Sequence, residues 1–157
     1  MQLPLGHTCA RGIDDLQILV DEGTTVPPGG DAGREVSVWA TPWSNPFMRW
    51  AFMKRPSDLE RVYAAIPEGI DILVSYQPPL YHGDRTFNLD SGRVEYVGSR
   101  ELLDAIERVR PRIVICGHVH GGFGRYEHQG IPIYNVSVVD ESYRLVNAAT
   151  VIDLPGV

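Results

Sequence analysis

Apolar runs and amphipathic stretches alternate along this chain in the order expected of an α/β protein. Two runs rich in β-branched residues, 70–75 and 112–116, predict strands that are buried on both faces. Between them, residues 99–109 place apolar side chains at helical spacing and predict an amphipathic helix. An earlier helix is predicted to start at Ser57, where Ser57 and Glu60 match an S-x-x-E capping box. Strand, helix and strand in this order indicate a βαβ-like unit.

Weaker patterns predict the remaining elements. Short apolar or alternating segments predict further strands over residues 16–20, 35–40, 131–136 and 150–154. Residues 126–130 are typical of a turn. The segment 41–52 contains two prolines and two tryptophans in a polar setting and predicts an irregular loop. We interpret its aromatic cluster as a satellite core rather than a base-stacking platform; the cluster consists of Trp39, Trp43, Phe47 and Trp50.

Composition limits the class of protein. A chain of 157 residues with 43% hydrophobic residues is typical of one globular domain, which we predict to span residues 1–157. The net charge of −6 argues against nonspecific binding to a nucleic-acid backbone. No apolar run approaches the ~20 residues that a membrane helix needs. The two cysteines, Cys9 and Cys116, form no CxxC pair and predict reduced thiols in a cytoplasmic protein, with Cys116 a packed thiol.

Two histidines follow the second buried strand. His118 and His120 are separated by one residue, so both imidazoles can face one point beyond the strand end, where ligands of α/β proteins usually bind. Neutral imidazole is a common ligand of zinc, iron and manganese. Glycines at positions 117, 121 and 122 are expected to let the backbone turn tightly. The motif alone fits a metal site or a solvated turn equally well.

Four motifs resemble one family. Residues 117–120 read GHVH and match a GHxH motif, and residues 71–79 read DILVSYQPP and resemble the segment DILVTHxPP. Residues 39–43 read WATPW and resemble G-[ST]-P-W, while residues 135–154 resemble the closing strands of the same branch. From about Asp14 to Leu154, the chain therefore resembles the C-terminal half of the calcineurin-like metallophosphoesterase superfamily, in its metallophosphoesterase-domain-containing branch.

The resemblance implies a fold and a site. The implied fold is the C-terminal half of an αββα sandwich with mixed β-sheets. The implied site binds two divalent ions (Mn, Fe or Zn), with His118 and His120 as metal-binding and catalytic residues. Tyr76 stands where the family has a ligand histidine, and the alternative is a loop tyrosine bonded to a neighbour. His82 and Asp84 stand where relatives contact substrate, and the alternative is a solvated polar loop.

The carboxylate motifs of the family are missing. The chain contains no D-x-H and no G-N-H, and neither Gly-Asp pair is followed by the required second aspartate. We therefore predict a metal-dependent phosphoesterase of phosphomonoesters or phosphodiesters that is truncated and has an incomplete dinuclear site. The alternatives are an inactive remnant or a phosphate- or nucleotide-binding module of the same fold, or one part of a longer enzyme. The expected partners are a small phosphorylated substrate such as a nucleotide, and a second copy or a complementing N-terminal half.

Overall fold

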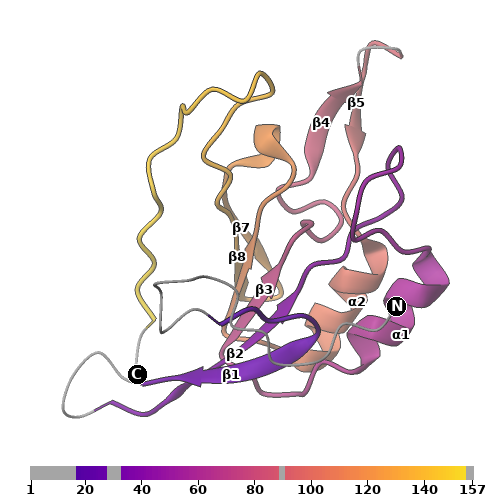
Figure 1. The fold of residues 1–157 in the computed structure, drawn as a ribbon. Coiled ribbons are helices and arrows are strands. Elements are labelled where there is room, and N and C mark those ends of the chain that lie inside the picture. Colours follow the sequence, from indigo (N-terminus) through magenta and orange to yellow (C-terminus); the bar gives the residue numbers. More distant parts are fainter. Residues whose placement is uncertain (1–16, 28–32, 89–90, 155–157) are drawn as a thin grey trace.

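A mixed six-stranded sheet is the centre of the computed structural model, which describes residues 17–27, 33–88 and 91–154 (Figure 1). Its strand order is β1-β2-β3-β6-β8-β7. These strands are β1 (Glu22–Val26), β2 (Val36–Thr41), β3 (Ile72–Ser75), β6 (Ile113–Cys116), β7 (Gly124–His128) and β8 (Ile131–Asn135). The other elements are helices α1 (Pro56–Ala64) and α2 (Arg100–Val109), the 3-10 turn η1 (His120–Gly122) and a separate hairpin of β4 (Arg85–Asn88) and β5 (Arg93–Tyr96).

The central strands run parallel and the two outer strands antiparallel. Strand β3 pairs in parallel with β2 and β6, and β6 pairs in parallel with β8. Strands β1 and β7 pair antiparallel with their neighbours. The fold class predicted from the sequence, α/β with a mixed sheet, is confirmed. The carboxyl ends of four parallel strands consequently meet at one edge of the sheet, which is where such folds bind ligands.

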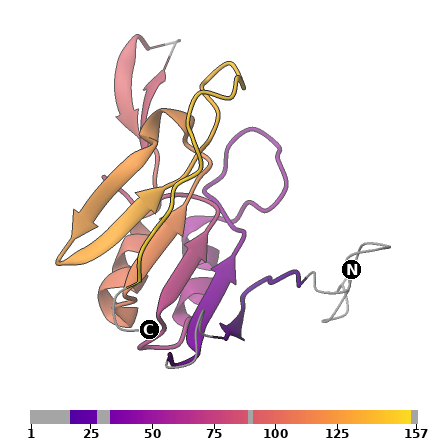
Figure 2. The ribbon, with the colours of Figure 1, turned by 90° about the vertical axis from the view of Figure 1, so that its left-hand side faces the viewer.

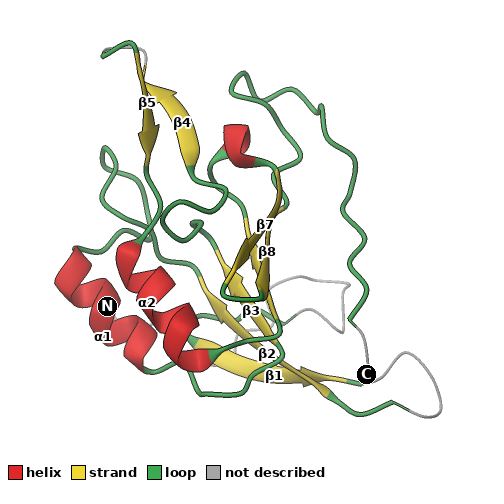
Figure 3. Cartoon of the chain, turned by 180° about the vertical axis from the view of Figure 1, so that it is seen from behind, coloured by secondary structure: helices red, strands yellow, loops and turns green. Residues whose placement is uncertain are grey.

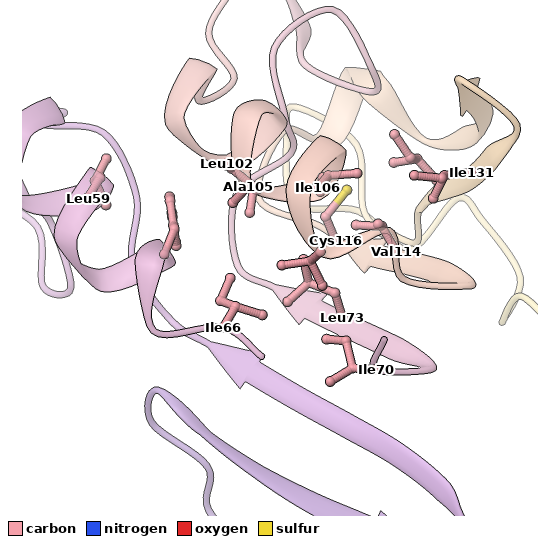
Figure 4. Close-up of a cluster of buried hydrophobic side chains, with 13 residues drawn as sticks. Leu59, Ile66, Ile70, Leu73, Leu102, Ala105, Ile106, Val114, Cys116 and Ile131 are labelled. Carbon is pink, nitrogen blue, oxygen red and sulfur yellow. The ribbon is translucent and has the colours of Figure 1, made fainter. Parts of the chain in front are cut away.

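The core lies between the sheet and the two helices, which cover the same face (Figure 3). Leu59 of α1, Leu102 of α2 and Leu73 of β3 are fully buried there. All three belong to one cluster, and Figure 4 shows Ile106 of α2 above Val114 and Leu73 of the sheet, with Leu59 on α1 at the edge of the cluster. Burying each such aliphatic side chain contributes about 1.5–3 kcal/mol. The helix pattern predicted from the sequence is therefore confirmed by the face that each helix buries.

The opposite face of the sheet is apolar and carries none of the described helices. Strand register pairs Val38 with Ile72 and Val74 with Ile115, so these residues share the side away from the core. The segment after β8 runs along this side (Figure 2); its Ile152 and Leu154 are half-buried, while its Val151 is 90% exposed. We call this surface the helix-free face, and it consists of Val38, Ala40, Ile72, Val74, Ile113 and Ile115, of which Ile113 is buried and the others are half-buried. The prediction of strands covered on both faces therefore holds fully on the helix side and in part on this side.

The capping box predicted for the first helix is wrong. Helix α1 begins at Pro56, and its N-cap is Arg55, which makes no side-chain capping bond. Proline suits the first helical position because the amide it lacks has no partner within the helix. In contrast, Ser99 caps α2, with its Oγ accepting a hydrogen bond of 3.1 Å from the amide of Leu102.

Strand pairing overrules two of the weaker predictions. Residues 17–19 are irregular and the first strand starts at Glu22, because residues 22–26 pair with β2; Leu16 lies outside the described residues. Residues 126–128 continue β7 as far as His128, and the turn is confined to Gln129 and Gly130, whose φ angles are 48° and 80°. The pattern of apolar residues in the sequence predicts neither the pairing of β1 with β2 nor that of β7 with β8.

Two further segments differ from the prediction. Residues 150–154 form no strand and do not join the sheet; Ile152 and Leu154 are half-buried and the other three residues are exposed. The hairpin of β4 and β5 was not predicted, because most of its residues are exposed and its sequence has no continuous apolar face. Figure 1 shows this hairpin projecting from the end of the molecule where the parallel strands finish.

Candidate functional site

A cavity of about 420 Å³ lies beyond the carboxyl ends of β2, β3 and β6. Five segments contribute to it: the loop after β2, the residues after β3, the β4–β5 hairpin with the residue after it, the histidine turn after β6, and the segment after β8. The hairpin adds Thr86 and is followed by Val97. The lining residues used below are Asn45, Phe47, Trp50, Tyr76, Gln77, His118, His120, Glu141 and Tyr143.

The turn after β6 brings both histidines to this cavity. His118 has a φ of 64°, so the left-handed residue of the turn is the histidine itself and none of the three glycines that were expected to let the backbone turn tightly. Gly122 is required for a different reason: a Cβ there would lie 1.9 Å from the carbonyl oxygen of Gly83. A non-glycine residue in left-handed conformation is uncommon and is often found at functional sites.

The two imidazoles have different surroundings. His118 is half-buried and its ring lies 4.5 Å from the ring of Tyr76, centroid to centroid. Burial lowers the pKa of His118, with the nearby His120 adding to the effect, so the neutral form that binds metals is favoured. Nδ1 of His120 lies 2.9 Å from the carbonyl oxygen of Asp140. Because a carbonyl can only accept, Nδ1 carries the proton and Nε2 is left as the free lone pair.

Tyr76 joins the histidines at the same cavity and is 41% exposed. Burial raises the pKa of its phenol, and the coulombic influence of Tyr143 raises it further. The hydroxyl is therefore protonated at neutral pH and is a weaker metal ligand than the histidine it replaces. The structure thus brings Tyr76, His118 and His120 together, while their coordination of a metal stays a prediction.

His82 and Asp84 are not among the residues that line this cavity. Nδ1 of His82 lies 2.8 Å from the carbonyl oxygen of Leu80. Asp84 is fully buried, and its Oδ2 accepts hydrogen bonds from the amides of Tyr81 and Gly98 at 3.0 and 2.9 Å. In this arrangement Asp84 stabilises the loop that carries His82. Their contact with substrate stays a prediction from the sequence.

Two buried amides that the sequence did not single out hold the site in place. The side-chain amide of Asn135 donates to the carbonyl oxygens of Gly83 and Val119, at 2.7 and 2.8 Å. Oε1 of Gln77 accepts from the amide of Asn45 at 2.9 Å and so fixes the loop after β2. The sequence does carry one signal that could have identified these two residues: each is a polar residue at or just after the carboxyl end of a buried strand.

Sequence similarity to curated proteins covers most of the chain. Metallophosphoesterase domain-containing protein 1 of Homo sapiens is 36% identical over 124 residues, which are 78% of this chain and 37% of that protein. The chain belongs to the metallophosphoesterase family. A further relative, UPF0046 protein T07D4.2 of Caenorhabditis elegans, is 32% identical over 122 residues, which are 76% of this chain and 30% of that protein. This metallophosphoesterase chain thus spans about a third of the length of the curated relatives it matches.

Structural comparison supports the same fold. One solved crystal structure matches this metallophosphoesterase chain with a TM-score of 0.51 at 18% identity, over 77% of this chain and 46% of that chain. No family model matches the sequence. In the described residues, no helix is both long and apolar enough to cross a membrane.

Metallophosphoesterases generally use divalent metals, so the donors at the cavity were compared with that requirement. Two imidazoles, the phenol of Tyr76 and the carboxylate of Glu141 line it, whereas the two ions of a dinuclear site each take four or more ligands, water included. The described part of the chain contains no group of three or more histidine, cysteine or acidic side chains that could hold an ion. These residues therefore supply part of a coordination set and do not complete one.

The cavity also corrects the interpretation of the aromatic cluster. Trp39 and Trp43 pack against the core, as a satellite core should. Phe47 and Trp50 do not: they are 50% and 47% exposed and line the cavity. For these two residues the prediction was wrong, because the sequence does not reveal the path of the loop that carries them.

Proposed function

We propose that this chain is the histidine-bearing part of a metal-dependent phosphoesterase that hydrolyses phosphomonoesters or phosphodiesters. The observation that carries the proposal is the convergence of His118 and His120 on one cavity at the sheet edge. The hydrogen bond from Nδ1 of His120 to a backbone carbonyl supports it, since metal-binding histidines are commonly oriented in this way. Membership of the metallophosphoesterase family makes a phosphoester the natural substrate class.

The proposed cofactors are divalent ions, two of Mn, Fe or Zn in the completed site. Hard divalent ions prefer oxygen ligands, and Glu141 is the one carboxylate among the described residues that line the cavity, so further carboxylates must come from outside the described residues. We infer that a complementing segment supplies them, and that a second copy of the chain is the alternative source. The relatives are about three times longer than the matched part, which leaves ample chain for such a segment.

The helix-free face offers a place for the complementing segment. Its residues are apolar and lie on parallel strands, and parallel sheets are normally covered on both faces. A layer packed there would reach the same sheet edge at which the histidines lie. We take residues 1–157 as one partial domain in the cytoplasm; both remain predictions.

A noncatalytic phosphate- or nucleotide-binding module is the second candidate. The protonated phenol of Tyr76 at a ligand position favours it, because a weakened coordination set can retain binding after losing turnover. The two candidates differ in one measurable property, the hydrolysis of an ester once all ligands are present.

The test combines metal binding with hydrolysis. Manganese and zinc affinity is measured by calorimetry, and hydrolysis by release of nitrophenol from nitrophenyl phosphate esters, for the chain alone and mixed with the unmatched N-terminal part of a curated relative. We expect His118→Ala and His120→Ala each to weaken metal binding by at least about tenfold. His128→Gln serves as the matched control, because Nε2 of His128 bonds to Glu107 and His128 does not line the cavity.

Each outcome decides between the candidates. Metal binding and hydrolysis that both require His118 and His120 support the phosphoesterase. Metal binding without hydrolysis in any mixture supports the binding module. Metal affinity that His128→Gln lowers as much as His120→Ala does would contradict both.

A further inference from the structure

Aromatic rings border the histidine pair on the side of the loop after β2. The ring of Trp50 lies 6.4 Å from that of His118 at an interplanar angle of 70°. Phe47 packs edge-on against Trp50, with centroids 5.3 Å apart. The ring of Tyr76 also lies beside that of His118, with the two centroids 4.5 Å apart. All three rings line the cavity and keep 41–50% of their surface exposed.

A fourth ring comes from the far side of the cavity. Tyr143 lies on the segment after β8, and its ring is 5.1 Å from that of His120 in an edge-on arrangement. It is 70% exposed. Residues from three separate segments thus place aromatic surface around one histidine pair. We call this set the aromatic wall, and it consists of Phe47, Trp50, Tyr76 and Tyr143.

The loop that carries Phe47 and Trp50 is held by polar bonds at its base. Backbone hydrogen bonds of 2.9 and 3.0 Å join Ser44 to Phe52 and to Lys54. The side chain of Asn45 donates to the carbonyl oxygens of Val97 and Gly98 at 3.3 and 3.2 Å. Since the base is fixed without burying the tip, the exposed rings are presented in a defined place, which lowers the ordering cost of binding.

The charges of the cavity do not favour a bare anion. No lysine or arginine is among its described lining residues, while Glu141 contributes a carboxylate. The exposed aromatic rings of this cavity suit the uncharged part of a ligand better than its phosphate. The volume of about 420 Å³ falls within the range of small-molecule sites and is unlike a flat protein-docking surface.

We propose that the aromatic wall binds a flat aromatic ring of the phosphoester, with the phosphate directed toward His118 and His120. The placement of the phosphate rests on the proposed phosphoesterase function; the ring contact rests on the wall alone. Aromatic side chains bind such rings by stacking, which tolerates different ring chemistries because each has a π-face. The ring is a nucleobase or a simple aryl group, and the test separates these two sources.

The experiment measures binding by nuclear magnetic resonance titration of the full chain without added metal. The probes are adenosine monophosphate, phenyl phosphate and ribose 5-phosphate, of which the last has no aromatic ring. We expect Trp50→Leu to weaken binding of adenosine monophosphate about 5- to 100-fold. Trp50→Phe should restore most of the affinity. Phe87→Leu is the matched control, since Phe87 is 57% exposed on β4 and does not line the cavity.

The outcomes separate the ring contact from catalysis. Tighter binding of adenosine monophosphate than of phenyl phosphate assigns a nucleobase, and equal binding assigns a simple aryl ring. Equal affinity for ribose 5-phosphate, or no loss in Trp50→Leu, overturns the proposal. If Trp50→Leu does not fold, Phe47→Leu makes the same comparison. Retained ring binding in a chain that never hydrolyses esters rejects the phosphoesterase and leaves the ring contact intact.

Discussion

At the scale of single residues, Asp71 holds a buried negative charge directly before β3. Its carboxylate accepts hydrogen bonds from Arg34, at 2.8 Å from Nη1, and from the amide and hydroxyl of Ser37, both at 2.9 Å. The Arg34 guanidinium holds the pKa of Asp71 well below its usual range, and the bonds from Ser37 act in the same direction. Because Arg34 is 53% exposed, solvent screens part of its contribution.

The first prediction is that Asp71→Asn lowers stability in a pH-dependent way. A carboxylate whose pKa is lower in the folded chain stabilises it above the unfolded value of about 3.9. This stabilisation disappears as the pH falls below that value. We expect Asp71→Asn to cost about 1–3 kcal/mol at neutral pH, and less in acid.

Urea unfolding over a series of pH values measures this effect. Asp104→Asn is the control, since Asp104 is exposed and pairs with Arg100 on the surface at 2.9 Å, an interaction worth about 0.3–0.5 kcal/mol. A stability difference between Asp71→Asn and the original chain that stays constant into acid would contradict the assignment.

Residues of the candidate site differ in how far the sequence reveals them. His118 and His120 could be predicted because a strand end and its following turn are local features. Phe47 and Trp50 could not, since their exposure depends on how the loop after β2 returns to Met53. Asn135 was also missed: its role is to bond carbonyls from two distant loops, which only the folded chain brings together.

At the scale of elements, the two helices begin in different ways. Ser99 is fully buried and its Oγ accepts from the amide of Leu102. Ser57 precedes Glu60 by three residues, the capping-box spacing that Ser99 lacks, but it lies inside α1, which already begins at Pro56. A motif therefore predicts a cap only when no other residue can begin the helix earlier.

We predict that alanine substitution lowers the free energy of unfolding at Ser99 and leaves it nearly unchanged at Ser57. Ser99→Ala removes a capping bond and should cost about 1 kcal/mol, within the usual range of 0.5–2 kcal/mol for N-cap losses. Ser57→Ala should change stability by less than about 0.5 kcal/mol, as expected of an exposed helical position. Thermal and urea unfolding of both variants measure the difference. Equal losses would show that the start of α1 has been placed wrongly.

Strands could be predicted from the sequence where burial of their side chains stabilises them, and could not be predicted where they depend mainly on pairing with a neighbouring strand. The apolar runs identified β3, β6 and β8 because these strands contribute to the core. Strand β1 and the hairpin of β4 and β5 depend on a neighbouring strand, and their largely exposed side chains carry no periodic signal. Residues 150–154 have the composition of a strand and no partner strand in the described structure.

At the scale of the whole molecule, the helix-free face is the main departure from a closed α/β domain. A sheet that packs on one side leaves apolar surface for another layer, and such surfaces promote association. We predict that the chain alone self-associates in solution. Size-exclusion chromatography with light scattering over a concentration series measures this.

A double variant tests whether this face is responsible. Val38→Thr with Val74→Thr keeps β-branched side chains and replaces one methyl group at each position. We expect a dissociation constant raised about tenfold, given ~0.8 kcal/mol for each buried methyl group. Val94→Thr, on the exposed hairpin strand β5, is the control. A stable monomer at every concentration would contradict the prediction.

The contact between Gly122 and Gly83 has a consequence for how this part of the chain can change. The backbone of the histidine turn touches that of the loop before the hairpin too closely for any side chain, and Asn135 bridges the same two loops. Neither loop can gain or lose a residue alone without breaking this spacing. Among related proteins, we consequently expect insertions and deletions between β4 and β5. The histidine turn and the loop before the hairpin should change length only together.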